Sequence, residues 1–578
     1  MSLSPNLSSR AGLLLASLLL SALTACAVNE KQPAPLAAEP PPPPPVAVGA
    51  AAPMAAADAA AYAVRAESSA KLMQSQSRIG FMPPRPAPMP GVAAEQREQY
   101  AAIASNPVQR AAENPVSTFS IDVDTGAYAN VRRFLSQGQL PPRDAVRVEE
   151  LVNYFDYRYP APRDRNTPFS VSTELAPTPW NAKTHLLQIG VQGWKPQGER
   201  PAANLVFLID VSGSMESPDK LPLVKASLKL LAQQLRPQDR LSLVVYAGRT
   251  AVVLEPTAGD QQAKIIAALD QLEAGGGTNG GAGIDLAYAM ARQGYIKGGV
   301  NRVMLATDGD FNVGVTDFDQ LLDRVKTQRK SGVALTTLGF GTGNYNEALM
   351  EQLADAGDGN YAYIDTLKEA QKVLVRQMDA TLTTIARDVK IQVEFNPAQV
   401  AEYRLIGYEN RALRREDFAN DKVDAGDIGA GHTVTALFEV ALVGEGGERI
   451  APLRYAAAQG ASAQSGELAH LQLRYKRPGD GNEAKSLLIE RAIAAKDSST
   501  LAASSDSFRL AAAVAGFGQL LRGGQYTQGF DYTAAIKLAQ DARGRDEDGE
   551  AGEFLQLVQL ARSLDAAALN TPVEDHGG

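Results

Sequence analysis

Short apolar runs alternate with amphipathic helical patterns throughout residues 199–385. The first run, LVFLID at residues 205–210, is unbroken and ends at a polar loop, as is typical of a strand buried on both faces. In the segment that follows, four apolar residues have the spacing of one helix face: Val224, Leu228, Leu231 and Leu235. Strands that alternate with helices of this length predict an α/β domain built on a doubly wound, mainly parallel sheet.

Two further folded regions flank this domain. Residues 113–198 combine a helical pattern with two strand patterns, which predicts an N-terminal α+β module. Residues 386–570 begin with alternating apolar and polar residues and end with helical patterns, which predicts a β-rich and then helical module. We therefore expect three folded parts with the doubly wound domain in the middle.

The N-terminal residues have the pattern of a targeting signal. Residues 1–25 contain an apolar run of about 13 residues, whereas a helix that crosses a bilayer needs about 20, so we predict a signal peptide. The tetrapeptide that ends at Cys26 (LTAC) resembles the lipobox of bacterial lipoproteins, in which the cysteine becomes the acylated first residue. By this resemblance, Ala27 points to the outer membrane. The alternative is an ordinary secreted protein with an incidental cysteine.

Residues 26–112 follow the predicted signal peptide and are rich in alanine and proline, with six consecutive prolines at residues 40–45. Such a composition cannot bury a core. We therefore predict a disordered tether between the lipidated cysteine and the folded parts, with a helical stalk at residues 49–72 as an alternative for that short stretch. Several acyl chains, at about 0.8 kcal/mol per buried methylene, would hold such a protein at a membrane of the bacterial envelope.

The amino-acid composition excludes several kinds of binding site. The chain has 56 Lys and Arg against 65 Asp and Glu, a net charge of −9, so it lacks the basic footprint of a nucleic-acid-binding protein. Its single cysteine excludes an internal disulfide framework, and its four histidines lie far apart in the sequence. A metal ion would have to be held by oxygen atoms.

Such oxygen atoms follow the predicted strands. Asp210, Ser212 and Ser214 stand at alternate positions directly after the first strand, Thr278 lies in a glycine-rich loop, and Asp308 follows a later strand. In open α/β sheets, ligands bind at the carboxyl ends of the strands, so we expect these side chains to converge on one cation. Taken singly, each has a simpler explanation, because the serines can cap a helix and the aspartate can close a turn.

This ordered set, D-x-S-x-S, a Thr flanked by glycines and T-D-G, resembles the metal-ion-dependent adhesion site of von Willebrand factor type A (vWA) domains. The resemblance implies that Ser212, Ser214 and Thr278 approach Mg²⁺ or Mn²⁺, whereas Asp210 and Asp308 act mostly through water. The opening NPVSTFSIDVDT and the tail also resemble the YfbK-like group of bacterial vWA lipoproteins. All-oxygen coordination suits these hard cations.

The expected function is binding. Neutral hydroxyls leave much of the cation's charge available, so we expect a protein partner that presents an Asp or Glu carboxylate, in adhesion or in assembly of an envelope complex. Two alternatives remain: a scaffold or chaperone-like protein in which the metal only stabilises loops, and an unrecognised hydrolase. The pair Asp122 and Asp124 is similar to the paired aspartates of haloacid-dehalogenase phosphatases but lacks the Gly-Thr or Gly-Val that should follow. We therefore expect that the protein is not an enzyme.

Overall fold

The computed structural model describes most of the chain after the predicted tether, namely residues 98–163, 166–195, 198–277, 280–309, 318–451, 453, 466–480, 484–495 and 498–570. The predicted signal peptide, Cys26, most of the tether and Thr278 lie outside these residues. The chain divides into two units, residues 1–90 and 91–578, and the description below concerns the second. Among the described residues, no helix is both long and apolar enough to cross a bilayer.

The central domain contains one six-stranded sheet. Its strand order is β10 (Tyr361–Ile364), β9 (Ala334–Phe340), β8 (Val300–Thr307), β5 (Ala203–Asp210), β6 (Arg240–Tyr246) and β7 (Thr250–Ala258). Five strands run parallel and β7 runs antiparallel to β6. Every residue of β5 is buried, because helices cover both faces. The predicted doubly wound, mainly parallel sheet is confirmed.

The two faces of this sheet have separate cores, and β5 contributes alternate residues to each. On one face, Phe207 and its neighbours pack against α4 (Leu221–Ala232), α5 (Gln262–Asp270) and α9 (Leu367–Gln371). On the other face, Leu208 packs in the core formed with α6 (Gly280–Gln293), α7 (Phe318–Arg329) and α8 (Glu347–Ala356). Because successive strand side chains point to opposite faces, this unbroken apolar strand serves two helix layers.

The strands outside the central domain form two more sheets. One has the order β1 (Gln109–Arg110), β12 (Val400–Ile406), β14 (Thr433–Leu442), β4 (Asn181–Gly193) and β3 (Phe169–Thr178). The other has the order β13 (Gly426–Gly429), β11 (Thr384–Phe395), β15 (Glu467–Lys476) and β16 (Leu487–Ala494), and β2 (Val116–Ser120) also pairs with β11. Residues from both sheets share a single apolar core, so they form a sandwich.

This sandwich joins the two regions that the sequence places on either side of the central domain. Strand β4 pairs with β14, and β2 pairs with β11, so each sheet contains strands from before and after the doubly wound domain. The N-terminal α+β module and the C-terminal β-rich module are therefore one body, and the central domain is inserted into it. Local sequence patterns carry no signal for pairing between strands about 270 residues apart.

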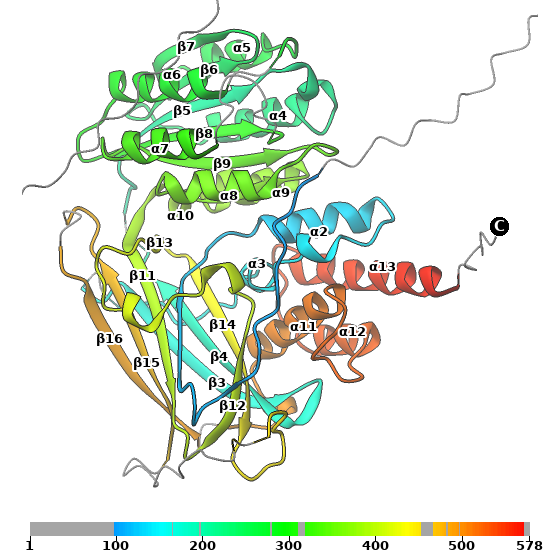
Figure 1. Cartoon of the computed structure of the whole chain (residues 1–578). Helices are drawn as coiled ribbons and strands as arrows, with labels where there is room; N and C mark the ends of the chain where they lie inside the picture. Colours follow the sequence, from blue (N-terminus) through cyan, green and yellow to red (C-terminus); the bar gives the residue numbers. More distant parts are fainter. Residues whose placement is uncertain are drawn as a thin grey trace, which may run out of the picture. The chain divides into compact units, whose positions relative to one another are not determined.

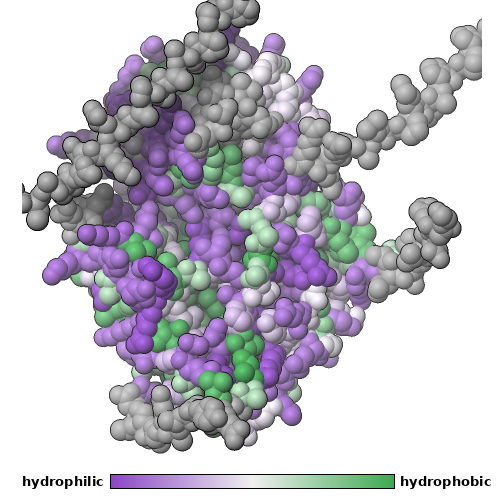
Figure 2. All heavy atoms as spheres, viewed as in Figure 1, coloured by the Kyte–Doolittle hydropathy of each residue, from purple (hydrophilic) through white to green (hydrophobic). Residues whose placement is uncertain are grey.

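Five helices of the flanking regions share a further core: α2 (Gly126–Ser136), α3 (Val148–Asn153), α11 (Asp506–Leu521), α12 (Tyr532–Asp541) and α13 (Glu550–Asn570). Phe554 of α13 contacts both Phe155 and Phe517 edge to face. Figure 1 shows α2, in blue, beside α13, in red. Hydrophilic side chains cover most of the face drawn in Figure 2, and the hydrophobic patches on it are scattered.

Candidate metal centre

The carboxyl ends of β5 and β8 bring Asp210 and Asp308 to the same edge of the sheet. Asp210 is the last residue of β5, and Asp308 directly follows Thr307, the last residue of β8. The two strands are parallel neighbours, so their ends meet at that edge. Both aspartates are fully buried.

Asp210 is held by hydrogen bonds from neutral donors. Its Oδ1 accepts the backbone N–H of Ser212 at 2.9 Å. Its Oδ2 accepts the hydroxyl of Thr307 at 2.9 Å and that of Tyr246 at 3.3 Å. Burial raises the pKa of Asp210 to about 6, the Ser212 N–H opposes this shift, and the charge of Asp308 adds to it. A nearby cation would favour the charged form of this carboxyl.

Ser212 and Ser214 lie in the loop after β5 with their hydroxyl oxygens 3.0 Å apart. Ser212 is buried and Ser214 is exposed to solvent. A short 3-10 helix begins at Gly213, and the Ser212 side chain makes no capping hydrogen bond to it. The next α-helix begins at Leu221, with Lys220 at its N-cap. Ser212 thus stands at the N-cap position of the 3-10 helix, but its hydroxyl does not cap it.

Asp308 is paired with a cation that sequence reasoning missed. Its Oδ2 accepts from the Lys220 ammonium at 2.9 Å and from the Asn344 amide at 3.1 Å. Lys220 also donates to Asn344 Oδ1 at 2.9 Å. Both additional residues lie next to ends of elements at this edge of the sheet: Lys220 precedes α4, and Asn344 follows β9. The strand-end rule could have pointed to Asn344, because β9 is another parallel strand.

The glycine-rich loop approaches the same edge. The carbonyl oxygen of Gly276 accepts the N–H of Gly213 at 3.0 Å, and the N–H of Gly275 donates to Val211 at 2.8 Å. These bonds join the loop to the segment that carries the two serines. Thr278, the predicted third hydroxyl, lies outside the described residues.

The residues that the structure describes at this edge fit a hard divalent cation. Two carboxylates and two hydroxyls come from neighbouring loops, and Mg²⁺ and Mn²⁺ prefer oxygen ligands. The charges of Asp210 and Asp308 are opposed by the single positive charge of Lys220. The donor set thus retains one unbalanced negative charge when both carboxyls are ionised.

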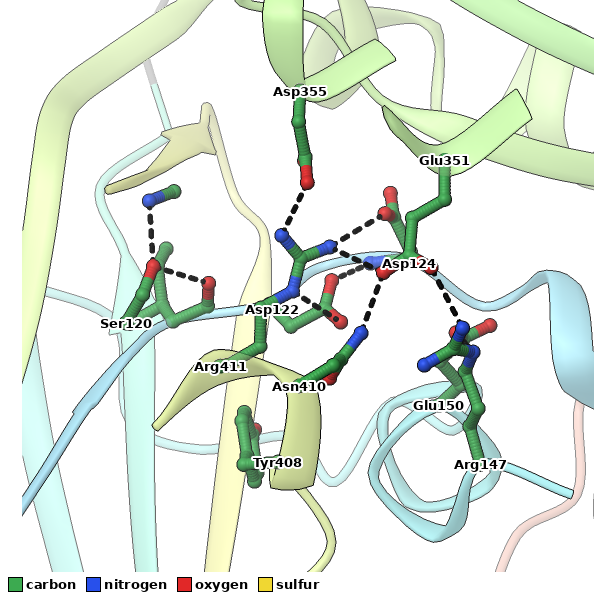
Figure 3. A network of polar contacts seen from close by, with 12 residues as sticks. Ser120, Asp122, Asp124, Arg147, Glu150, Glu351, Asp355, Tyr408, Asn410 and Arg411 are labelled. Carbon is green, nitrogen blue, oxygen red and sulfur yellow. Dashed lines mark hydrogen bonds and ion pairs between the residues drawn. The ribbon is translucent and has the colours of Figure 1, made fainter. Parts of the chain in front are cut away.

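A second acidic cluster surrounds Arg411 (Figure 3). Asp122, Asp124 and Glu351 each offer an oxygen, and these oxygens lie within 4.8 Å of one another. The Arg411 guanidinium contacts all three, at 3.2, 3.4 and 3.0 Å, and Asp355 at 2.6 Å. We call these five residues the Arg411 clasp. The Arg411 guanidinium already supplies a positive charge to these carboxylates, so we do not assign a metal ion to this cluster.

Comparison with known protein families assigns the central domain and its flanking regions to families. Residues 204–377 match the family described as "von Willebrand factor type A domain", and residues 94–188 match the one described as "von Willebrand factor". The protein is therefore a vWA-domain protein. Residues 380–564 match the family described as "Uncharacterized protein YfbK, C-terminal".

The chain belongs to the YfbK family. It is 51% identical over 472 residues to the "Uncharacterized protein YfbK" of Escherichia coli (strain K12), a match that covers 80% of this chain and 81% of that protein. A "UPF0353 protein" of Mycolicibacterium vanbaalenii is 27% identical over 218 residues, covering 33% of this chain and 64% of the relative. Among solved structures, a "von Willebrand factor type A from Catenulispora acidiphila" aligns with a TM-score of 0.38 at 16% identity, covering 69% of this chain and 91% of that one.

Proposed function

We propose that this protein is anchored to the bacterial envelope through Cys26 and binds a protein partner through a divalent cation. Five residues would hold the cation: Asp210, Ser212, Ser214, Thr278 and Asp308. The observation that carries the proposal is the meeting of Asp210, Asp308 and two adjacent hydroxyls at one edge of a vWA sheet. vWA domains commonly mediate protein interactions, which agrees with this assignment.

The residues at this edge define what kind of partner fits. A bound Mg²⁺ or Mn²⁺ would supply a positive charge that attracts an anionic oxygen into an open coordination position. Ser212 and Ser214 contribute neutral hydroxyls, which do not cancel that charge. Ser214 is exposed, so the site is reachable from solvent. We therefore infer a partner that presents an Asp or Glu carboxylate, as in adhesion or in the assembly of an envelope complex.

The location and the absence of catalysis belong to the same proposal. The LTAC tetrapeptide at residues 23–26 supports a lipid anchor, and Ala27 supports the outer membrane as its location. The candidate site contains donors for a cation, and we assign no catalytic role to any of its residues. A scaffold in which the cation only stabilises loops is the competing function.

The test is a pull-down from envelope extract with the full-length chain in detergent, as wild type and as Asp210→Ala, each with Mg²⁺ and with chelator. We expect a protein that is retained only by wild type in the presence of Mg²⁺. Asp270→Ala is the matched control, because Asp270 is an exposed aspartate at the end of α5. Recovery of the same proteins in all conditions would favour the scaffold. Turnover of a generic hydrolase substrate panel, lost in Asp210→Ala, would instead indicate an enzyme.

A further inference from the structure

We propose that Lys220 is a built-in competitor of the divalent cation and sets how tightly the candidate metal centre binds it. This inference rests on the proposed function and adds to it a residue that the vWA resemblance does not assign. The lysine and the cation would both interact with Asp308. Binding of the cation is then opposed by a fixed positive charge of the protein itself.

The position of Lys220 is fixed by packing. The residue is 6% exposed, and its backbone N–H donates to the carbonyl of Ser217 at 3.0 Å. Its aliphatic stem lies directly against Gly341, where φ is +78° and a Cβ atom would overlap the lysine Cγ. A side chain at position 341 would displace the stem, so glycine is required there. The ammonium is thus held on Asp308 by its surroundings, which lowers the entropy cost of the ion pair.

The charges at the site explain why the lysine matters. Neutral hydroxyls and one backbone N–H hydrogen-bond to Asp210, whereas Asp308 accepts from an ammonium at 2.9 Å. A divalent cation at this edge would repel that ammonium, since two positive charges a few ångströms apart are unfavourable in a partly buried setting. Lys220 therefore stabilises the metal-free site and weakens cation binding.

This arrangement also links the cation to the partner. A carboxylate from the partner adds a negative charge and offsets the positive charge of Lys220. Cation and partner should then bind cooperatively, each strengthening the other by the same factor. A site with this property holds its cation firmly only when the partner is present.

The experiment is a calorimetric titration of the full-length chain in detergent with Mg²⁺, comparing wild type with Lys220→Met, Lys220→Gln and Lys220→Arg. We expect both neutral variants to bind Mg²⁺ at least tenfold more tightly, and Lys220→Arg to stay within threefold of wild type. Lys220→Gln keeps a hydrogen-bond donor for Asp308, so it guards against misfolding of the methionine variant. Asn344→Ala removes an amide donor to Asp308 without changing charge, and we expect little change in affinity.

Two further measurements distinguish the outcomes. Lys229→Met is the matched control, because Lys229 is a partly exposed lysine of α4 that pairs with Asp270; its affinity should equal that of wild type. With chelator, Lys220→Met should melt at a lower temperature than wild type, and Mg²⁺ should raise its melting temperature more than that of wild type. Equal or weaker Mg²⁺ binding by both neutral variants would overturn the role of Lys220 while leaving the metal site standing. Absence of Mg²⁺ binding in every variant would overturn both.

Discussion

The candidate metal centre and the Arg411 clasp both gather buried carboxylates, yet they treat the negative charge differently. In the clasp, one guanidinium contacts Asp122, Asp124, Glu351 and Asp355. At the candidate metal centre, Asp210 accepts from hydroxyls and a backbone N–H, whereas Asp308 accepts from the Lys220 ammonium. The difference teaches that the neighbouring groups, and not the number of acids, decide whether a cluster can take a ligand.

The clasp also has a different position in the chain. Asp122 and Asp124 follow β2, Glu351 and Asp355 lie on α8 of the vWA domain, and Arg411 lies between β12 and β13. Figure 3 shows their side chains converging from these three segments. The clasp therefore links the inserted vWA domain to the flanking body. We expect it to contribute to stability, and we propose that the candidate metal centre contributes to binding instead.

The largest expected effect is that of Arg411→Ala. This change removes the shared counter-ion of three buried carboxylates and of the more exposed Asp355. Breaking a buried ion pair from one side costs about 3–5 kcal/mol. Urea denaturation should show this loss in the free energy of unfolding. Arg414→Ala is the control, because Arg414 is 74% exposed in its pair with Asp417 and its loss should change the free energy of unfolding little. Similar small losses in both variants would contradict a structural role of the clasp.

The second effect concerns the metal centre. Mg²⁺ at about 100 times its dissociation constant should stabilise the wild type by about 2.7 kcal/mol, and Asp210→Ala should lose this gain. Thermal melting with and without Mg²⁺ measures it. Asp124→Asn in the clasp should melt at a changed temperature yet keep the full response to Mg²⁺. If the clasp variant also lost its response, the proposed separation between the two clusters would be wrong.

The third effect is a pH dependence beside the clasp. Glu347 on α8 is fully buried, and burial raises its pKa to about 7, which the nearby Arg147 partly opposes. Its folded pKa exceeds the ordinary value of 4.5, so the stability it contributes is present below pH 4.5 and is lost as the pH rises through 7. Glu347→Gln should reduce the loss in the free energy of unfolding between pH 5 and pH 8 by about 2 kcal/mol.

Denaturation midpoints at several pH values measure this change. The exposed variant Glu416→Gln is the control and should follow the wild-type pH profile. A Glu347→Gln profile as steep as that of wild type would show that other groups carry the pH dependence. Its Mg²⁺ response should equal that of wild type at every pH, because Glu347 is not among the residues assigned to the metal centre.

Sequence patterns predicted the vWA sheet because its signals are local. Residues 205–209 are apolar throughout, and β5 and β8 each end where such an apolar run meets a polar loop. By contrast, nothing near Asp122 in the sequence indicates that Arg411 will face it, since the pairing depends on β2 and β11 meeting in one sheet. Lys220 was missed for a related reason: its place before a helix was visible, but the direction of its side chain depends on packing against Gly341.

The smallest effects compare one polar group in each cluster. Ser214 is exposed at the metal centre, and Asn410 is exposed beside the clasp, where its amide donates to Glu351 at 2.6 Å. Ser214→Ala removes a predicted ligand and should weaken Mg²⁺ binding about tenfold, or 1.4 kcal/mol, while changing metal-free stability by less than about 0.5 kcal/mol. Titration calorimetry and urea denaturation of the same samples give both numbers.

Asn410→Ala should show the reverse pattern. It removes a hydrogen bond to a charged acceptor, which is worth about 1 kcal/mol for a group that solvent reaches, so unfolding should become easier while Mg²⁺ affinity stays the same. Ser331→Ala, an exposed serine after α7, is the control and should change neither quantity. A Ser214→Ala variant that lost stability but kept its affinity would assign Ser214 to loop structure. The contrast between a binding cluster and a stabilising cluster would then have to rest on Asp210 and Asp308 alone.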